Sequence, residues 1–400
     1  MNTMKNIKTK SLILLLILFS NLHADVAVFP EQEWESKTPD SVGIESEKVE
    51  YLFDLAFQDQ ATQSAVLIKN GYIIKEKYNE SFDQESFGTS WSMAKSFYAA
   101  LIGISIDRGE IKSLDDKVSD YVDYYNDERS EITIRQILNM TSGLDFPENE
   151  HESMFFRHDQ IAYVKEVGVE QLPEQVFEYN NVNSMIVGEI LKNATGISAE
   201  ILLEDRIFKP IGIDKFTLWK DGTGNPMTYC CIDMSARDYS RFGLLFSRKG
   251  KWHNDQIISE NYVNETFTPY WGQTPNWWTD ENRGYSLHWW ISKYDDDAKI
   301  FNASGKFGQY IFVDHENDII FTRITKYHPM PGSQQNWGFL KYIDVDNVDL
   351  WIDVLRFLHG IGIIDLQSDI TTPNTFKDGE SKEFYSNYGE IMNAISSLSK

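Results

Sequence analysis

A serine and a lysine three positions apart are the residues of this chain best placed to do chemistry together. Ser92 and Lys95 stand in the stretch Trp-Ser-Met-Ala-Lys-Ser, residues 91–96. Residues three apart on a helix share one face, so the Lys95 amine can reach the Ser92 hydroxyl and take its proton. A serine activated by a neighbouring base is a nucleophile for carbonyl carbons. The spacing alone is a weak signal, because Ser397 and Lys400 repeat it at the end of the chain.

The segment after this pair indicates how it is positioned. Residues 96–106 are apolar on nearly every side and Gly109 follows them, which is typical of a buried helix with a glycine near its C-terminal cap. Ser92 then lies at the N-terminus of a core helix. Unpaired backbone N–H groups and the helix dipole stabilise developing negative charge at such an end. The stretch therefore offers a nucleophile, a base and half of an oxyanion hole.

Strand patterns lie towards both ends of the chain, with helical patterns between them. Two β-rich runs flank Asn70-Gly71, the dipeptide most typical of a β-hairpin. The helix that begins near Ser92 follows, and after it a mostly helical stretch extends to about residue 224. Strand patterns return at residues 285–291, 309–313 and 319–325, and residues 347–358 have the pattern of an amphipathic helix. We expect an α+β fold: an antiparallel sheet flanked by helices, with an inserted, mostly α-helical lobe.

The first 24 residues have the pattern of a secretory signal peptide. Three lysines precede an apolar run that is too short to span a bilayer, and cleavage is expected after Ala24. We therefore expect an exported protein, periplasmic or secreted, without stable membrane insertion. Residues 25–360 are expected to form one domain, with an α/β lobe at about 25–110 and 225–360 and a helical lobe at about 111–224. Residues 361–400 have the composition of a polar C-terminal extension.

Composition and motif spacing argue against several other partners and sites. The formal net charge of −24 disfavours binding to nucleic acid. Cys230 and Cys231 are the two cysteines and are adjacent; a disulfide between neighbours is strained, so we expect two free or buried thiols. Metal-site spacings are not met, and Gly222-Thr223-Gly224 lacks the third glycine of a dinucleotide-binding loop. We expect no metal and no cofactor.

Other stretches match, in order, the landmarks of a known superfamily. After residues 91–96 come Thr141-Ser142-Gly143-Leu144, Tyr179-Asn180-Asn181, Pro210-Ile211-Gly212-Ile213 and residues 235–243. Together they make the chain resemble the serine β-lactamase and penicillin-binding-protein superfamily. Within it, the chain is most similar to the branch of class C β-lactamases, related esterases and 6-aminohexanoate-oligomer hydrolases. The resemblance extends from about residue 64 to residue 351 and implies the β-lactamase/transpeptidase-like fold.

The resemblance implies roles for the matching residues. Ser92 is the expected nucleophile, Lys95 its base and Tyr179 a proton relay between the serine and the leaving group. Asn181 is expected to hydrogen-bond Lys95 or a substrate carbonyl. From the residues alone, Tyr179 reads as an ordinary half-buried tyrosine and Asn181 as the cap of the next helix.

The third motif of the superfamily, Lys-Thr-Gly, is altered here and two registers are open. Lys306-Phe307-Gly308 keeps the lysine and the glycine, whereas Ala303-Ser304-Gly305 keeps the hydroxyl and the glycine. We favour the second, because residues 308–314 then match the following strand of the esterase and oligomer-hydrolase members. In that register Ser304 and Gly305 border the site, and the backbone N–H of Lys306 completes the oxyanion hole.

The altered motif bears on the substrate. In β-lactamases the motif lysine helps to hold the substrate carboxylate, so its loss favours uncharged substrates. The aromatic residues from Trp271 to Tyr285, Trp277 and Trp278 among them, are candidates either for an apolar acyl pocket or for core.

We therefore expect an exported serine hydrolase that cleaves a small-molecule ester or amide through an acyl-serine intermediate. The alternative within enzymes is a β-lactamase or D-alanyl-D-alanine peptidase acting on β-lactams or peptidoglycan. From a different class, the chain would be a non-catalytic relative that binds or assembles. The sequence makes no prediction of oligomeric state.

Overall fold

The structure is a computed structural model that describes residues 27–146, 154–274, 283–291, 300–325, 348–363 and 382–399. The expected signal peptide lies outside the described residues, as do Trp277 and Trp278. Within the described ranges, no helix combines the length and the apolar character needed to cross a membrane.

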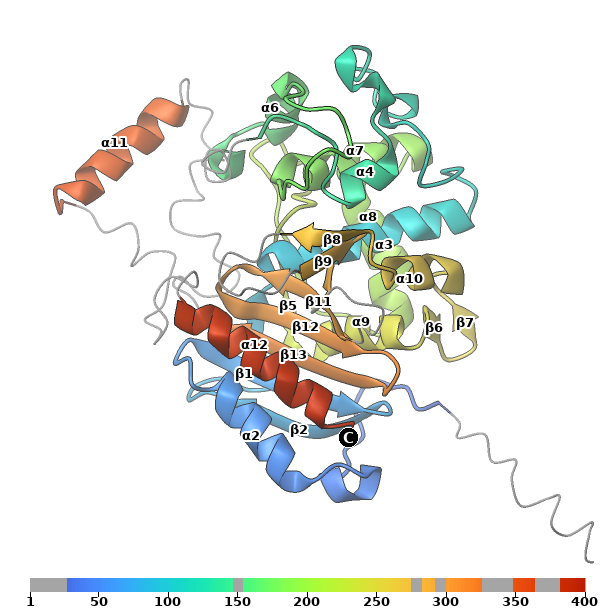
Figure 1. Cartoon of the computed structure of the whole chain (residues 1–400), viewed down its shortest axis with the longest axis vertical. Helices are drawn as coiled ribbons and strands as arrows, with labels where there is room; N and C mark the ends of the chain where they lie inside the picture. The colour runs from blue at the N-terminus through green and yellow to red at the C-terminus, as the bar shows by residue number, and fades with distance from the viewer. Residues whose placement is uncertain are drawn as a thin grey trace, which may run out of the picture.

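Eight of the described strands form one large antiparallel sheet (Figure 1). Every neighbouring pair in it runs antiparallel. From edge to edge the strands are β2 (Tyr72–Tyr78), β1 (Thr62–Lys69), β13 (Ile319–Thr325), β12 (Gln309–Asp314), β11 (Ile300–Gly305), β10 (Trp289–Ile291), β9 (Arg283–Ser286) and β8 (Trp271–Thr274). Because β1 pairs with β13, the N-terminal and C-terminal strands meet in one sheet, and the predicted arrangement is confirmed.

The β1–β2 hairpin turns where its sequence predicts. Asn70 and Gly71 have φ angles of 54° and 83°, and Lys69 lies opposite Tyr72 across the turn. A two-residue turn of this type needs a positive φ at both positions, which asparagine and glycine tolerate best.

Helices cover both faces of the sheet. Along β1, Val66 and Ile68 point into the core on one face, while Ala65 and Leu67 point into the core on the other. On the second face, the helices that contribute buried side chains are α2 (Ser46–Ala56) and α12 (Lys382–Ser397), blue and red in Figure 1. The first face packs on α3 (Ala94–Asp107), α9 (Ala236–Ser247) and α10 (Glu260–Thr266).

Helix α3, which carries the Ser92 turn at its start, is almost entirely enclosed. Every residue from Ala94 to Ser105 is buried, and Gly109 follows the helix in the left-handed conformation with φ 72°. The predicted core helix with a glycine at its C-terminal end is confirmed. Because α3 is buried on all sides, its first turn, which directly follows Ser92, is packed in the core.

Helix α12 brings residues 382–397 into the core, although the sequence reads as a polar extension there. Apolar side chains one turn apart on α12 are buried: Phe384, Tyr388, Ile391 and Ile395. The Tyr388 hydroxyl donates to Asn302 Oδ1 of β11 at 2.7 Å. The Asn387 side chain donates to the Leu55 carbonyl of α2 at 2.9 Å. This helix therefore belongs to the same packed unit as the sheet and α2.

Between α3 and β5 (Ile232–Ser235) the described chain is mostly helical. Its helices and helical turns are η3 (Val118–Asp120), η4 (Glu128–Glu131), α4 (Ile134–Leu138), α6 (Gln160–Glu166), α7 (Asn181–Thr195), α8 (Ala199–Leu203), η5 (Glu204–Phe208) and η6 (Lys209–Ile211). In Figure 1, α4, α6 and α7 lie above the large sheet. The α+β fold with an inserted helical lobe is confirmed.

Short strands and helices complete the described elements. β3 (Phe87–Thr89), β5 and β4 (Thr217–Leu218) form a small sheet, and β6 (Lys251–Trp252) pairs with β7 (Asp255–Gln256). The remaining elements are η1 (Pro39–Val42), η2 (Trp91–Met93), η7 (Lys306–Gly308) and α11 (Val348–Gly360). The last agrees with the helix expected at residues 347–358.

One strand prediction is wrong in part. Residues 285–291 have the pattern of a single strand, but the structure divides them between β9 and β10, with a tight turn at Leu287 and His288. Both turn residues have positive φ angles, 43° and 64°. Leucine disfavours a positive φ, and neither residue is among those that dominate tight turns, so the sequence gives little local signal for it.

Contacts with distant helices hold this turn in place. The Leu287 N–H donates to Asn139 Oδ1 and the His288 N–H donates to the Leu138 carbonyl, both at 2.9 Å. The Ser96 hydroxyl of α3 donates to the His288 carbonyl at 2.6 Å. Tertiary packing therefore determines a turn that local preference would not form.

The two adjacent cysteines also differ from expectation. Cys230 and Cys231 are buried, as expected, but the structure joins them in a disulfide. The expectation of free thiols is therefore wrong. It considered only the two neighbouring residues, whereas both side chains are enclosed by the packed core.

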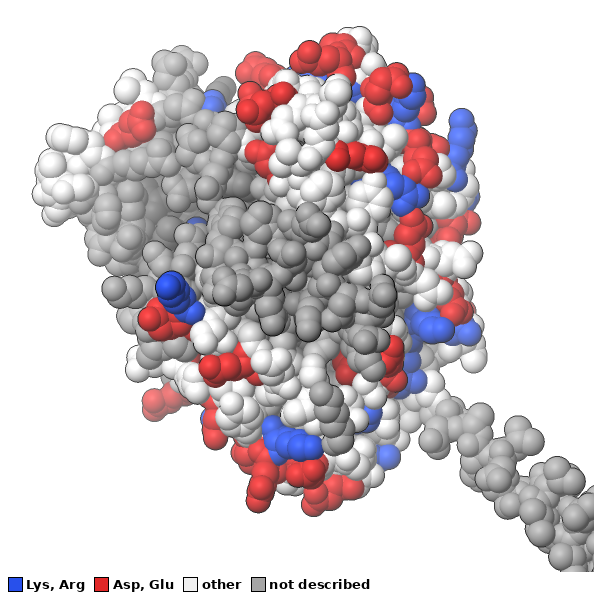
Figure 2. All heavy atoms as spheres, in the orientation of Figure 1, with Lys and Arg blue, Asp and Glu red and all other residues white. Residues whose placement is uncertain are grey.

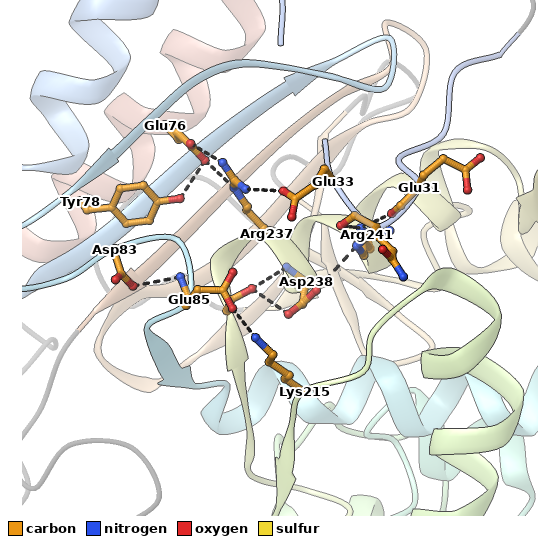
Figure 3. A network of polar contacts seen from close by, with 12 residues as sticks. Glu31, Glu33, Glu76, Tyr78, Asp83, Glu85, Lys215, Arg237, Asp238 and Arg241 are labelled. Atoms are coloured by element: carbon orange, nitrogen blue, oxygen red, sulfur yellow. Dashed lines mark hydrogen bonds and ion pairs between the residues drawn. The ribbon is translucent and has the colours of Figure 1, made fainter. Parts of the chain in front are cut away.

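A network of charged side chains fastens α9 to β2 and to the N-terminal segment (Figure 3). Arg237 of α9 pairs with Glu76 of β2 at 2.6 Å and with Glu33 at 3.6 Å. One turn later, Arg241 donates to the Glu31 backbone carbonyl at 2.6 Å. The network therefore fixes the N-terminal segment against α9.

The face shown in Figure 2 is rich in acidic side chains, in line with the net charge of −24. Asp and Glu side chains gather over the helical lobe and around the end of the molecule that carries α2. A surface of this sign repels polyanions.

Candidate active site

Ser92 and Lys95 meet at the start of α3. Ser92 lies in the helical turn η2, immediately before α3, and Lys95 lies in the first turn of α3. Lys95 Nζ is 3.0 Å from Ser92 Oγ. The structure therefore brings the two residues into the contact that their spacing predicts.

The amine of Lys95 is surrounded by uncharged oxygen atoms. The side chain is only 1% exposed, and Nζ donates to Asn181 Oδ1 and to the Tyr229 carbonyl, both at 2.9 Å. Burial holds the pKa of Lys95 well below its ordinary value, because the charged form loses its hydration. A lysine in this setting can stay neutral and accept the proton of Ser92.

Asn181 reaches Lys95 because its neighbour caps the helix instead. Asn180 is the N-cap of α7, and its side chain accepts the Asn183 N–H at 2.8 Å. The interpretation of Asn181 as the helix cap is therefore wrong. As the first residue of α7, Asn181 is free to direct its amide oxygen at the lysine.

Tyr179 lies near Lys95 and comes from the extended segment that leads into α7. Lys95 Nζ is 5.0 Å from the centroid of the Tyr179 ring. That ring stacks on Trp290 at 5.4 Å, with 28° between the planes, and meets the edge of Tyr285 at 6.2 Å. The Tyr179 ring therefore lies beside the Lys95 amine and is held there by contacts with two other aromatic rings.

Five aromatic rings form a surface around Tyr179, here called the aromatic wall: Phe177, Tyr179, Trp271, Tyr285 and Trp290. Neighbouring rings in it lie 4.8 to 6.4 Å apart. Tyr285 is buried, while the other four are partly exposed. Of the aromatic residues expected to line a pocket or fill the core, Tyr285 therefore belongs to the core and Trp271 to the partly open surface.

The end of β11 lies against the turn that carries Ser92. A Cβ atom on Gly305 would collide with the backbone carbonyl oxygen of Ser90, so only glycine allows this close approach. Ser304, just before it, is partly buried. The strand end at residues 303–305 therefore borders the Ser92 turn.

Lys306 and Phe307 follow in η7, beside the same turn. The Lys306 side chain is exposed, and its Nζ lies 5.1 Å from the centroid of Phe307. The Phe307 ring meets Trp91 edge to face at 5.5 Å. Trp91 and Phe307 both have positive φ angles, 47° and 64°. The Ser92 turn and η7, which meet here, therefore each contain a residue in a backbone conformation that side chains disfavour.

His288 is a residue near the site that sequence reasoning missed. It is buried, and Nε2 lies 3.1 Å from Ser184 Oγ of α7 while Nδ1 lies 3.3 Å from the Tyr285 hydroxyl. Burial and, second, the charge of Lys95 hold the pKa of His288 well below its ordinary value. It matches no motif, and it lies within a segment that reads as an ordinary strand.

Among the described side chains, no group of three or more His, Cys, Asp or Glu residues is arranged to hold a metal ion.

A family model described as Beta-lactamase matches residues 59–341, more than half of the chain. Penicillin-binding protein 4 of Amycolatopsis lactamdurans is 30% identical over 135 residues, which are 32% of this chain and 35% of that protein. The chain thus matches about a third of the length of that relative.

Solved structures show the same fold. A candidate 6-aminohexanoate-dimer hydrolase from Bacillus anthracis has a TM-score of 0.61 at 19% identity, covering 84% of this chain and 90% of its own. EstCE1, a hydrolase with promiscuous acyltransferase activity, has a TM-score of 0.59 at 12% identity, covering 77% and 99%.

Proposed function

This chain belongs to the beta-lactamase family and is a serine hydrolase, and we propose that it cleaves an ester or amide bond through an acyl-serine intermediate at Ser92. One observation carries the proposal. The buried Lys95 amine, whose described partners are uncharged oxygens, lies 3.0 Å from the Ser92 hydroxyl.

In the proposed acylation step, neutral Lys95 takes the proton of Ser92 as Oγ attacks the substrate carbonyl carbon. The negative charge that develops on the carbonyl oxygen is stabilised by the backbone N–H groups of Ser92 and Lys306. Lys95 then returns its proton through Tyr179 to the leaving group, and the bond to that group breaks. Asn181 holds the Lys95 amine in place throughout.

Deacylation reverses the order of proton transfers. A water molecule loses a proton to the Lys95 and Tyr179 pair and attacks the acyl carbon. The tetrahedral intermediate collapses, the acid leaves, and the proton returns to Ser92 Oγ. Charge in this intermediate is again stabilised by the two backbone N–H groups.

The surroundings of Ser92 support an uncharged substrate. In the register favoured above, no lysine occupies the motif position that binds a carboxylate, and the Lys306 side chain lies along Phe307 at the surface. The aromatic wall, of which Tyr179 is part, offers a partly open apolar surface. Apolar acyl or alcohol groups of a small-molecule substrate fit such a surface. Export to the periplasm or the medium is part of the same proposal and is supported by the sequence of residues 1–24 alone.

A second candidate is a β-lactamase or D-alanyl-D-alanine peptidase. The partial match to a penicillin-binding protein is the observation that favours it. In that case a cation near Ser92 would be needed for the substrate carboxylate, and Lys306 would be the residue to supply it.

The test compares hydrolysis of p-nitrophenyl butyrate and nitrocefin by the wild type and by Ser92→Ala. We expect Ser92-dependent ester cleavage and no turnover of nitrocefin, with thermal unfolding showing that the variant keeps its fold. Rapid nitrocefin turnover would favour the second candidate. Ester hydrolysis that survives in Ser92→Ala would contradict the acyl-serine mechanism.

A further inference from the structure

A buried histidine that the proposed mechanism does not use links the elements around Lys95. His288 is 3% exposed, and each of its ring nitrogens lies within hydrogen-bond distance of a hydroxyl, Ser184 Oγ at 3.1 Å and Tyr285 Oη at 3.3 Å. A neutral imidazole has one donor and one acceptor, and each hydroxyl can act as either. Both nitrogens are therefore satisfied in either tautomer.

The backbone of His288 is in a conformation that would suit glycine better. Its φ of 64° lies in the left-handed region, and Leu287 before it has a φ of 43°. Side chains with a Cβ disfavour this region, and such residues persist where the surroundings compensate. Glycine would adopt the turn more easily, so the contacts of His288 compensate for the cost of this backbone conformation.

The first link from His288 leads to α7. Ser184 lies three residues after Asn181 and therefore on the same face of the helix. Asn181 is the residue whose amide oxygen accepts from Lys95. The Thr228 hydroxyl donates to the Ser184 carbonyl at 2.7 Å, so this turn of α7 is fixed through both its side chain and its backbone.

The second link leads to Tyr179. The Tyr285 ring packs against Trp290 at 4.8 Å and against Tyr179 at 6.2 Å, edge to face in both cases. A hydrogen bond from the imidazole to the Tyr285 hydroxyl restrains that ring, and the ring in turn restrains Tyr179. Two of the groups that face Lys95, the Asn181 amide and the Tyr179 ring, are thus linked to His288.

We propose that His288 is a positioning residue for proton transfer, which keeps Tyr179 and Asn181 in register with Lys95 through Tyr285 and Ser184. The inference rests on the proposed function, because that function gives Tyr179 the task of protonating the leaving group. Burial keeps the imidazole neutral, and a proton on Lys95 would lower the pKa of His288 further, so the imidazole adds no positive charge beside the base.

The test uses two butyrate esters that form the same acyl-enzyme. p-Nitrophenolate leaves as a stabilised anion, whereas the ethoxide of ethyl butyrate needs a proton as it leaves. The quantity to measure is kcat/KM, because it reports acylation for both esters. If His288 positions the proton relay, its loss lowers kcat/KM for ethyl butyrate about 10-fold more than for p-nitrophenyl butyrate, since general acid catalysis contributes about 10²-fold or more.

The informative variant is His288→Gly, which suits the backbone and removes only the imidazole. Tyr179→Phe should show the same selective loss, and the double variant should show no further loss if the two residues act in one path. Asparagine tolerates the left-handed conformation and reaches the Tyr285 hydroxyl. His288→Asn should therefore recover part of the kcat/KM for ethyl butyrate, relative to p-nitrophenyl butyrate, that His288→Gly loses. Tyr285→Phe, which keeps the ring, gives a second measurement in case His288→Gly fails to fold.

The matched control is His315→Gly. His315 lies in the β12–β13 turn, where its ring stacks on Phe267 at 4.9 Å, and its removal should leave the ratio between the esters unchanged. Equal losses on both esters in His288→Gly and Tyr285→Phe, with a selective loss in Tyr179→Phe, would overturn the inference alone. No selective loss in Tyr179→Phe would overturn the relay role of Tyr179 and the inference with it.

Discussion

Replacing Lys95 with methionine should change how the stability of the protein depends on pH. In the native state burial holds the pKa of Lys95 well below its ordinary value. In the unfolded chain the same amine titrates near its ordinary pKa of about 10.4. Between these two values the unfolded state binds one proton that the native state does not. The free energy of unfolding of the wild type therefore rises with pH across this window.

The size of the effect follows from linkage. One proton bound only by the unfolded state gives a slope of about 1.4 kcal/mol per pH unit. Lys95→Met keeps a similar volume and removes this proton. Within the window, the free energy of unfolding of Lys95→Met minus that of the wild type should therefore increase by about 1.4 kcal/mol for each unit by which the pH is lowered.

A constant term is added to this slope. Without the amine, Asn181 Oδ1 and the Tyr229 carbonyl each lose the 2.9 Å hydrogen bond that they accept, at a cost of about 1–3 kcal/mol for each buried acceptor. That cost does not depend on pH. The reasoning is tested by how the difference in free energy of unfolding between wild type and Lys95→Met changes with pH, and not by the size of that difference at one pH.

The assay is urea unfolding of both proteins at pH 7, 8 and 9, with Lys306→Met as the control for removing a lysine from the surface of the same site. A difference between wild type and Lys95→Met that stays constant over these two pH units would refute the reasoning. It would mean that the native and unfolded states bind the Lys95 proton equally.

Two further predictions concern the altered third motif. Gly305→Ala places a Cβ against the Ser90 carbonyl, so β11 must move away from the Ser92 turn; we expect kcat/KM for p-nitrophenyl butyrate to fall at least about 10²-fold, as when an oxyanion-hole donor is lost. Activity within threefold of the wild type would show that β11 does not shape the site. Lys306→Ala keeps the backbone N–H and should lower kcat/KM less than about 10-fold, since the mechanism uses no Lys306 side chain. A loss as deep as that of Ser92→Ala would show that the register Lys306-Phe307-Gly308 is the functional one.

Much of the architecture could be predicted because it depends on local patterns. Asn70-Gly71 determines its hairpin through the φ angles that its two residues tolerate. The period-2 and helical patterns locate β12, β13 and α11 to within a few residues. The Ser92–Lys95 contact follows from helix geometry alone, because three residues correspond to nearly one turn. These features involve residues that are close in the sequence.

The remainder of the site depends on contacts between distant segments, which no local pattern encodes. The hydrogen bond between Asn181 and Lys95 joins residues that lie 86 positions apart in the sequence. The turn at His288 forms against local preference because α3 and α4 bind its backbone. The low pKa of Lys95 exists only because the packed chain excludes water from around the amine. The sequence by itself determined which residues could react, and the tertiary structure decided which groups surround them, because burial and long-range hydrogen bonds arise only when the chain has folded.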